Sequence, residues 1–166
     1  MILNRTSEDF SLPAFRRLVW MFPIVYMLHV LEQLPHFTGW ARRYANASLT
    51  MRDYLVVHVT GVVVAVAAPF IIKHFPNRVV IFLFFTFILT PAVFFHIIFH
   101  AGATAVFGTY SPGLLTALTI YPVTFILVGR QALREHLISS RAATISFLLA
   151  GLFHTADVSH NIFKAW

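Results

Sequence analysis

The segment Val79–Phe107 reads VVIFLFFTFILTPAVFFHIIFHAGATAVF, and its 29 residues include no Asp, Glu, Lys or Arg. A helix rises by about 1.5 Å per residue, so a helix of this length would measure about 43 Å. The hydrocarbon layer of a membrane is about 30 Å thick. We therefore predict a membrane-spanning helix that tilts, kinks or protrudes from the bilayer.

Four other apolar runs surround this segment, and a spanning helix needs about 20 mostly apolar residues. The chain does not show the alternating pattern of a β-barrel. We therefore expect an all-α integral membrane protein, a bundle of about five transmembrane helices in a single domain (16–166) after a polar tail (1–15). Pro23, Pro91 and Pro122 fall inside apolar runs and are expected to kink the helices. The four runs are Leu18 to about Leu34, Tyr54–Ile72, Leu114–Val128 and Ala142 to about Phe163.

The composition of the whole chain agrees with a membrane location. Of the 166 residues 58% are hydrophobic and 11% are charged, whereas soluble domains have about 25% charged residues. The absence of cysteine excludes disulfides, thiolate metal sites and cysteine nucleophiles. The net charge is +6, but the basic residues form no continuous stripe, so we expect no nucleic-acid partner.

The distribution of Lys and Arg predicts the orientation of the bundle. With five spans, the amino-terminal tail and the loops 73–78 and 130–141 share one side and hold eight of the 12 basic residues. The other side holds four: Arg42, Arg43, Arg52 and Lys164. We therefore expect the amino terminus in the cytoplasm.

Seven of the nine histidines fall in one layer of this topology, near the opposite side of the membrane. Ionisable groups that face lipid cost about 2.5–3.5 kcal/mol each, so they are expected to face the bundle interior. His29 and Glu32 are three residues apart and His96 and His100 are four apart, so each pair shares a helix face. The layer contains His29, His36, His58, His96, His100, His154 and His160, together with Glu32 and Asp157.

The segment Leu28–Gln33 (LHVLEQ) resembles the signature of the HXXEE family, small bacterial integral membrane proteins named for a His-x-x-Glu-Glu motif. The similarity extends over roughly residues 16–155 and implies a bacterial inner (cytoplasmic) membrane. It leaves the reaction open. Two positions depart from the family pattern, because Gln33 replaces the second motif Glu and His96 stands where the family has Asn. Three further segments carry the similarity: PHFTGWARRY (35–44), FHAGAT (99–104) and YSPGLLTA (110–117).

The first interpretation of the polar layer is a metal site, because imidazoles with one or two carboxylates suit transition metals. We expect one or two ions of Fe, Zn or Mn in a membrane metalloenzyme, of oxidoreductase or hydrolase type, that acts on a lipophilic substrate beside membrane lipid. Gln33, His58 and His160 are expected to bind the metal or to support its ligands. The expected ligands are His29, Glu32, His96, His100, His154 and Asp157.

Three alternatives remain. Glu32 with a histidine, assisted by Tyr110 and Gln33, suits a metal-free acid–base isomerase or cyclase, and Glu32 and Tyr110 are the candidate catalytic residues in either case. Two facing histidines such as His29 and His154 suit a haem b carrier. A structural or accessory subunit of a larger complex needs no chemistry at all. The sequence does not indicate the oligomeric state.

Overall fold

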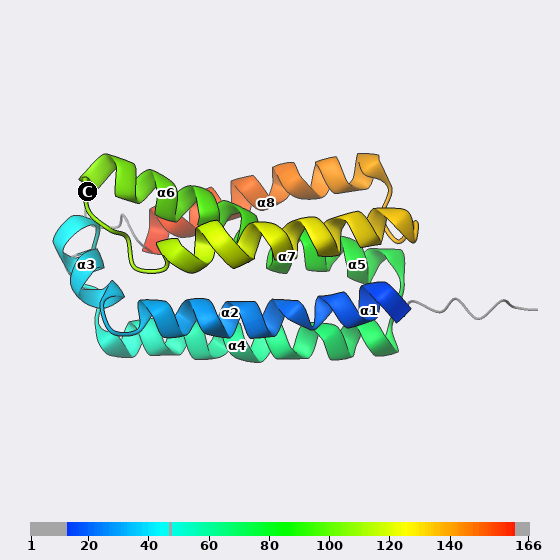
Figure 1. Ribbon diagram of the computed structural model, residues 1–166, viewed down its shortest axis with the longest axis horizontal. Helices are drawn as coiled ribbons and strands as arrows, with labels where there is room; N and C mark the ends of the chain where they lie inside the picture. The colour runs from blue at the N-terminus through cyan, green and yellow to red at the C-terminus, as the bar shows by residue number, and fades with distance from the viewer. Residues whose placement is uncertain (1–12, 47, 162–166) are drawn as a thin grey trace, which may run out of the picture.

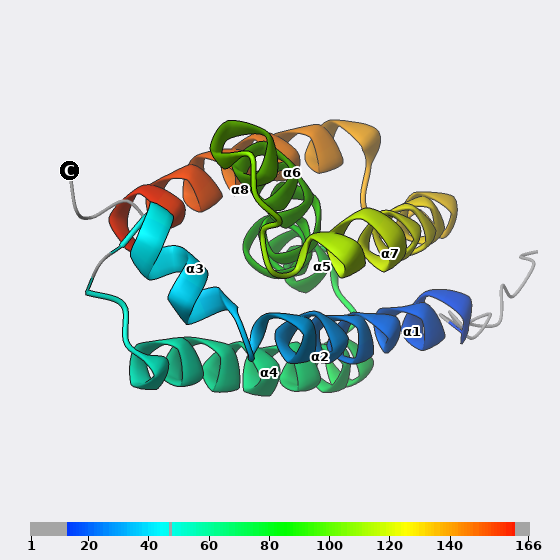
Figure 2. The same cartoon turned by 60° about the vertical axis from the view of Figure 1, so that its left-hand side comes forward.

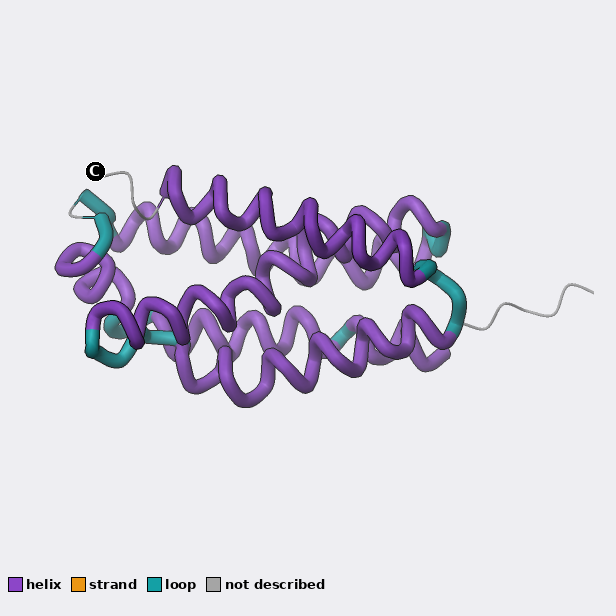
Figure 3. Tube along the Cα trace, turned by 90° about the horizontal axis from the view of Figure 1, so that it is seen from above, coloured by secondary structure: helices purple, strands orange, loops and turns teal. Residues whose placement is uncertain are grey.

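The computed structural model describes residues 13–46 and 48–161, and within these residues the chain is almost entirely helical, with no strand. The loops that connect one span to the next lie at the two ends of the molecule (Figure 3). The helices, in chain order, are α1 (Pro13–Val19), α2 (Met21–Gln33), α3 (Phe37–Tyr44), α4 (Met51–His74), α5 (Arg78–Phe84), the π-helix η1 (Phe85–Phe95), α6 (His96–Phe107), α7 (Leu114–Arg134) and α8 (Ser140–Asn161).

Five stretches of the described residues are helical, long and apolar enough to cross a membrane, which confirms the predicted five-span bundle. The protein is therefore a multi-pass membrane protein. Large apolar side chains such as Val56, Val63 and Leu148 are more than half exposed on the outside of the bundle, as contact with lipid requires. The five stretches are Ala14–Gln33, Met51–His74, Arg78–Phe107, Leu114–Arg134 and Ser140–His160.

The spans run side by side along the long axis of the molecule (Figure 1). Helices α1 and α2 pack against α4 and α7, and α7 also packs against η1 and α6. Helix α8 packs against η1 and α5. The turn between α6 and α7 lies at the same end of the bundle as α3 (Figure 1).

The first span is broken at Trp20, between α1 and α2. Proline lacks an N–H group, so Pro23 cannot donate the helical hydrogen bond to Val19, and the chain makes a tighter turn in which Trp20 N–H bonds to Arg17 O at 3.2 Å. The span begins earlier than the sequence predicts. Residues 1–12 of the expected polar tail lie outside the described residues, and its last three residues belong to α1, where Phe15 is completely buried.

The third span contains the π-helix instead of a simple proline kink. The segment Phe85–Phe95 includes Pro91 and joins α5 to α6 without a break in helical structure. π-Helices have wider turns than α-helices and occur frequently at functional sites. His96 is the first residue after this segment, and its Nδ1 lies 3.3 Å from the Pro91 carbonyl oxygen.

Helix α3 is short and was not among the predicted elements. It crosses one end of the bundle between the ends of α4 and α8 (Figure 2). Phe37, Trp40 and Ala41 on α3 are buried against Tyr54 of α4 and Ala103 of α6. The helix is too short to span a membrane, and its buried contacts with α4 and α6 hold it against the end of the bundle.

Gly151 of α8 lies close against Phe95 of η1. A Cβ atom at this position would lie 2.9 Å from Cζ of Phe95. We predict that Gly151→Val destabilises the protein by about 1–3 kcal/mol, because overpacking displaces the aromatic ring. The thermal unfolding midpoint of the purified protein in one detergent measures this effect.

Gly102→Val is the matched control, because a Cβ at Gly102 meets no atom within 4 Å. We expect this change to lower the midpoint by less than Gly151→Val does. Equal midpoints for the two variants would contradict the close packing of α8 on η1.

Candidate metal centre

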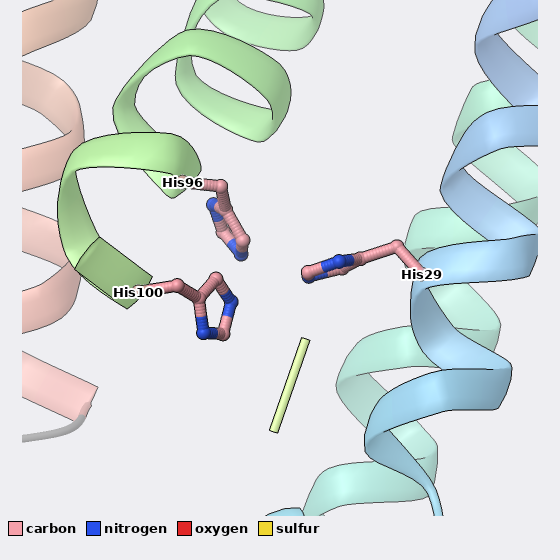
Figure 4. Close-up of side chains that lie close together, drawn as sticks. All are labelled: His29, His96 and His100. Atoms are coloured by element: carbon pink, nitrogen blue, oxygen red, sulfur yellow. The ribbon is translucent and has the colours of Figure 1, made fainter. Parts of the chain in front are cut away.

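Three histidines from two helices converge in the interior of the bundle. His29 projects from α2 toward His96 and His100, which lie on the same face of α6 (Figure 4). One ring nitrogen of each histidine lies within 4.8 Å of one ring nitrogen of the other two. His29 and His100 are buried and His96 is half-buried, so the cluster is largely removed from solvent.

The hydrogen bonds of His96 and His29 define which ring nitrogen is available. His96 Nδ1 faces the Pro91 carbonyl oxygen, which only accepts, so Nδ1 carries the proton. His29 Nδ1 lies 2.7 Å from Oγ1 of Thr116. The hydroxyl of Thr116 donates to the Glu32 carboxylate at 2.5 Å, so His29 Nδ1–H donates to Thr116. Each Nε2 atom therefore has a free lone pair, and His29 Nε2 has no hydrogen-bond partner.

His100 has the same tautomer. Its Nε2 accepts from the side-chain amide of Gln33 at 3.1 Å, so its Nδ1–H donates to Oγ of Ser111 at 2.9 Å. Gln33 is buried, and its Oε1 atom has no hydrogen-bond partner. All three histidines thus bind protein acceptors through Nδ1 and present Nε2 as a potential ligand. This arrangement is typical of metal-binding histidines, whose second nitrogen donates to a protein acceptor.

Glu32 does not belong to this cluster of ligand atoms, because both of its carboxylate oxygens are hydrogen-bonded at the start of α7. Oε1 accepts from the backbone N–H groups of Gly113 and Leu115, each at 3.1 Å, and from the Tyr110 hydroxyl. Oε2 accepts from the backbone N–H and the hydroxyl of Thr116 at 2.9 and 2.5 Å. Glu32 therefore caps the amino terminus of α7 and fixes the hydroxyl to which His29 donates.

Tyr110 lies in the turn between α6 and α7, outside the spans, and its phenol is half or more exposed. Partial burial raises the pKa of Tyr110 above its usual value, and its hydrogen bond to Glu32 raises the pKa further. The phenol therefore remains protonated at neutral pH and serves as a donor to Glu32.

The turn before α7 approaches the histidines closely. Gly113 has φ +104°, a conformation that favours glycine. A Cβ atom on Gly113 would lie 2.6 Å from Cε1 of His29 and 2.9 Å from Cε1 of His100. Glycine at this position thus allows the turn to cover the histidine cluster.

The remaining predicted residues lie outside the cluster. The His154 ring on α8 is centred 5.3 Å from the His96 ring and stacks on Phe95, with its Nε2 unpartnered. Asp157 and His58 line a pocket that also reaches His96 and Gln33. His58 Nδ1–H donates to the Tyr54 carbonyl oxygen at 2.8 Å, because a carbonyl oxygen can only accept. His160 is exposed in the last turn of α8.

Sequence reasoning missed Ser111 and Thr116, the hydroxyl residues that orient His100 and His29. Neither residue is ionisable, so neither stands out in a search for ligands. A usable signal exists, because Ser111 directly precedes the Pro112–Gly113 turn that begins a membrane span and Thr116 follows it by three residues. A helix amino terminus buried in a membrane needs acceptors for its N–H groups, so a polar partner such as Glu32 was to be expected there.

A family model described as a protein of unknown function with an HXXEE motif matches residues 20–127 of the chain, well over half of its length. The chain belongs to the HXXEE family. The matched region includes His29, Glu32, Gln33, His96, His100 and the turn before α7, whereas α8 with His154 and Asp157 lies beyond it. Comparisons with curated proteins and with solved structures gave no match.

We predict that Glu32→Gln lowers the stability of the protein by about 1.5–3 kcal/mol, the usual range for hydrogen bonds to a charged group. The glutamine loses the negative charge at the amino terminus of α7 and turns one acceptor into a donor that faces N–H groups. Thermal unfolding in detergent measures the loss.

Tyr110→Phe provides the graded comparison, because it removes one of the five donors and leaves the carboxylate in place. Its effect should be smaller than that of Glu32→Gln. An unchanged unfolding midpoint for Glu32→Gln would refute the capping role of the carboxylate.

Proposed function

We propose that this HXXEE protein binds a transition-metal ion between His29, His96 and His100 and acts as a membrane metalloenzyme on a lipophilic substrate. The supporting observation is that three imidazoles converge while each Nδ1 is hydrogen-bonded to a protein acceptor. A packed core does not need three imidazoles around one point, and the buried Nε2 of His29 is an acceptor without a partner, which is costly. A metal ion bound to all three would relieve this cost.

The spacing fits a metal ion after small movements of the side chains. Tetrahedral nitrogen ligands at about 2.1 Å from zinc lie about 3.4 Å from one another. The ring nitrogens of the cluster lie within 4.8 Å of one another. Side-chain rotations that move each ring by about 1 Å would bring the three nitrogens to the spacing of zinc ligands. Binding also requires the Gln33 amide to leave Nε2 of His100. A half-turn of that amide would exchange its NH₂ group for the unpartnered Oε1 and offer a fourth ligand.

Three histidines and one further coordination position suit zinc. The same three histidines also suit iron or manganese if additional oxygen ligands complete the coordination. Such an ion supplies Lewis acidity and activates water or dioxygen, so both hydrolase and oxidoreductase chemistry are consistent with the proposal. Glu32 and Thr116 would act through His29 by holding its Nδ1 proton. The bias of eight basic residues against four supports an amino terminus in the cytoplasm of a bacterial inner membrane.

Two observations favour a metal over the alternatives. Both oxygens of Glu32 are occupied by donors from α7 and Tyr110, an arrangement that suits an anchor better than a general base. The His154 ring stacks on Phe95 and faces the His96 ring. Two histidines that hold a haem would instead lie on opposite sides of a wide gap. An accessory subunit without chemistry would leave the three matched tautomers unexplained.

The first test is the metal content of protein purified in a mild detergent without chelators. We expect about one transition-metal ion per chain, with binding lost as the pH falls because the ligand imidazoles must be neutral. His29→Ala, His96→Ala and His100→Ala should each weaken binding by tenfold or more. Elemental analysis and titration with Zn²⁺, Mn²⁺ and Fe²⁺ measure both quantities.

His74→Ala is the matched control, since His74 is exposed at the other end of α4 and its Nδ1 bonds to the Phe70 carbonyl oxygen of its own helix. This variant should retain the metal. Wild-type protein without stoichiometric metal at neutral pH would refute the proposal. Metal that survives the double change His29→Ala and His100→Ala would refute the choice of ligands.

A second test uses two glycines with positive φ. Gly113→Ala should weaken metal binding, because its methyl group would displace the rings of His29 and His100. Gly108 also has positive φ (+62°), but a Cβ there meets nothing within 4 Å. Gly108→Ala should therefore add comparable backbone strain and leave the metal affinity unchanged. Equal metal affinities for the two variants would contradict the close approach of the turn to the site.

A further inference from the structure

A groove of about 460 Å³ lies between α7 and α8, and η1 forms its floor. The two helices are consecutive in the chain, yet both pack on η1 and make little contact with each other. Aromatic rings supply much of the lining, with Phe85 from η1, Phe125 from α7 and Phe147 from α8. The groove is separate from the candidate metal centre, because none of the three clustered histidines lines it.

The groove follows one half of the membrane thickness. At its deeper end the Phe94 ring joins both walls, with its centroid 5.2 Å from that of Phe125 and 4.9 Å from that of Phe147. At its other end the groove reaches Leu133 and Ile138, beside the loop between α7 and α8. That loop lies at the end of the bundle opposite α3 (Figure 1). Helix α7 rises about 12 Å from Phe125 to Leu133, most of the roughly 15 Å that one leaflet adds to the hydrocarbon layer.

The groove has one charged residue among its described lining residues, Arg130. Arg130 lies one helical turn before the last residue of α7, within the membrane-spanning stretch Leu114–Arg134. Among the described residues it has neither a hydrogen-bond partner nor an ion-pair partner. A cation at this depth is costly unless it reaches water or an anion, so Arg130 marks the place where an anion would be stabilised.

The chain itself does not supply that anion within the part that the structure describes. Glu135 is the acidic residue closest to Arg130 in the sequence, but it belongs to the side of α7 that packs on α1. Its Oε1 accepts from the backbone N–H of Phe15 at 3.1 Å and from the side-chain amide of Gln131 at 2.7 Å. No Asp or Glu of the described residues lines the groove. The anion must therefore come from outside the chain.

The surroundings of the groove favour a lipid over a soluble anion. Arg134 ends α7 and Arg141 lies in the first turn of α8, so further positive charge lies at the same end of the bundle as Arg130. A soluble anion would leave the aromatic walls uncovered, whereas an acyl chain would cover them. A zwitterionic head group would add a cation beside these arginines, which like-charge repulsion disfavours.

We infer that the groove between α7 and α8 binds an anionic phospholipid. Its phosphate binds Arg130, because a guanidinium group pairs well with phosphate oxygens. One acyl chain lies along Phe85, Phe125 and Phe147 and ends near Phe94. Basic pockets between spanning helices commonly bind anionic head groups in this way. This site lies apart from the histidines, so the lipid binds whether or not the protein holds a metal ion.

The experiment compares two spin-labelled lipids in full-length protein reconstituted in phosphatidylcholine bilayers. The fraction of immobilised probe per protein gives the relative association of phosphatidylglycerol and phosphatidylcholine. We expect phosphatidylglycerol to associate about fivefold more strongly, a difference of about 1 kcal/mol. Unlabelled phosphatidylglycerol should displace the probe, whereas inorganic phosphate at constant ionic strength should not.

The variant Arg130→Gln tests the head-group contact and should reduce the preference for phosphatidylglycerol to less than twofold. Arg78→Gln is the matched control, because Arg78 begins α5 at the same end of the bundle and does not line the groove. This variant should retain the preference. Unfolding midpoints close to that of wild type establish that both variants are folded.

The variant Gly129→Leu tests the acyl-chain contact. A Cβ at Gly129 would lie 4.0 Å from Cε1 of Phe85, an ordinary contact, so α7 accepts the side chain while its remaining atoms fill the groove. The immobilised fraction of phosphatidylglycerol should fall at least twofold. Gly102→Leu is the control, because Gly102 lies outside the groove and a Cβ there meets no atom within 4 Å.

Three outcomes would overturn the inference. They are equal association of the two lipids in wild type, an undiminished preference in folded Arg130→Gln, and displacement of the probe by inorganic phosphate. Metal content is a separate measurement that distinguishes this site from the proposed function. Arg130→Gln should lose the lipid preference and keep its metal, whereas a wild-type protein that prefers phosphatidylglycerol but holds no metal would support the groove and refute only the metal proposal.

Discussion

The structure depends on one carboxylate. Glu32 on α2 accepts five hydrogen bonds at the start of α7, and these join two spans that are about 80 residues apart in the sequence. The first N–H groups of any helix lack partners within that helix. In a membrane, unsatisfied N–H groups are especially costly. A negative charge at the positive end of the helix dipole is also favourable, so one side chain satisfies both requirements and brings the turn over the histidines.

The same carboxylate connects fold and site through Thr116. The Thr116 hydroxyl donates to Glu32 and accepts from His29, so the anchor also determines which nitrogen of His29 carries the proton. Ser111, in the turn just before α7, performs the corresponding role for His100. This turn and the first turn of α7 therefore together support two histidines from two helices. This arrangement gives a physical reason for a motif in which His and Glu are three residues apart.

The sequence predicted the fold well because lipid imposes a simple rule on helix length and polarity. The five spans and the shared face of His96 and His100 follow from apolar run length and helical periodicity. The start of the first span does not follow from these rules, because the charges of Arg16 and Arg17 interrupt the apolar run inside a helix whose Phe15 is buried. Helix α3 does not either, because it is held by aromatic contacts between spans and has no hydropathy signal of its own.

The site was predicted in part. Depth and spacing placed His29, His96 and His100 together, but helical spacing indicates only which face a residue occupies and not what lies opposite. Glu32 shares a face with His29, yet its partner is the amino terminus of α7 and the partners of His29 are imidazoles. The tautomers follow from Thr116, Ser111 and the Pro91 carbonyl, which only the tertiary structure brings near the rings.

The π-helix η1 makes the position of the two α6 histidines sensitive to chain length. Successive residues of a helix lie roughly a quarter of a turn apart around its axis. Deleting a single residue between Phe85 and Phe95 would therefore rotate His96 and His100 by roughly a quarter of a turn relative to α5, away from His29. A one-residue deletion is usually harmless in a loop, but here it would separate the three imidazoles without removing any of them. The eleven residues of η1 thus set the angular register of the site.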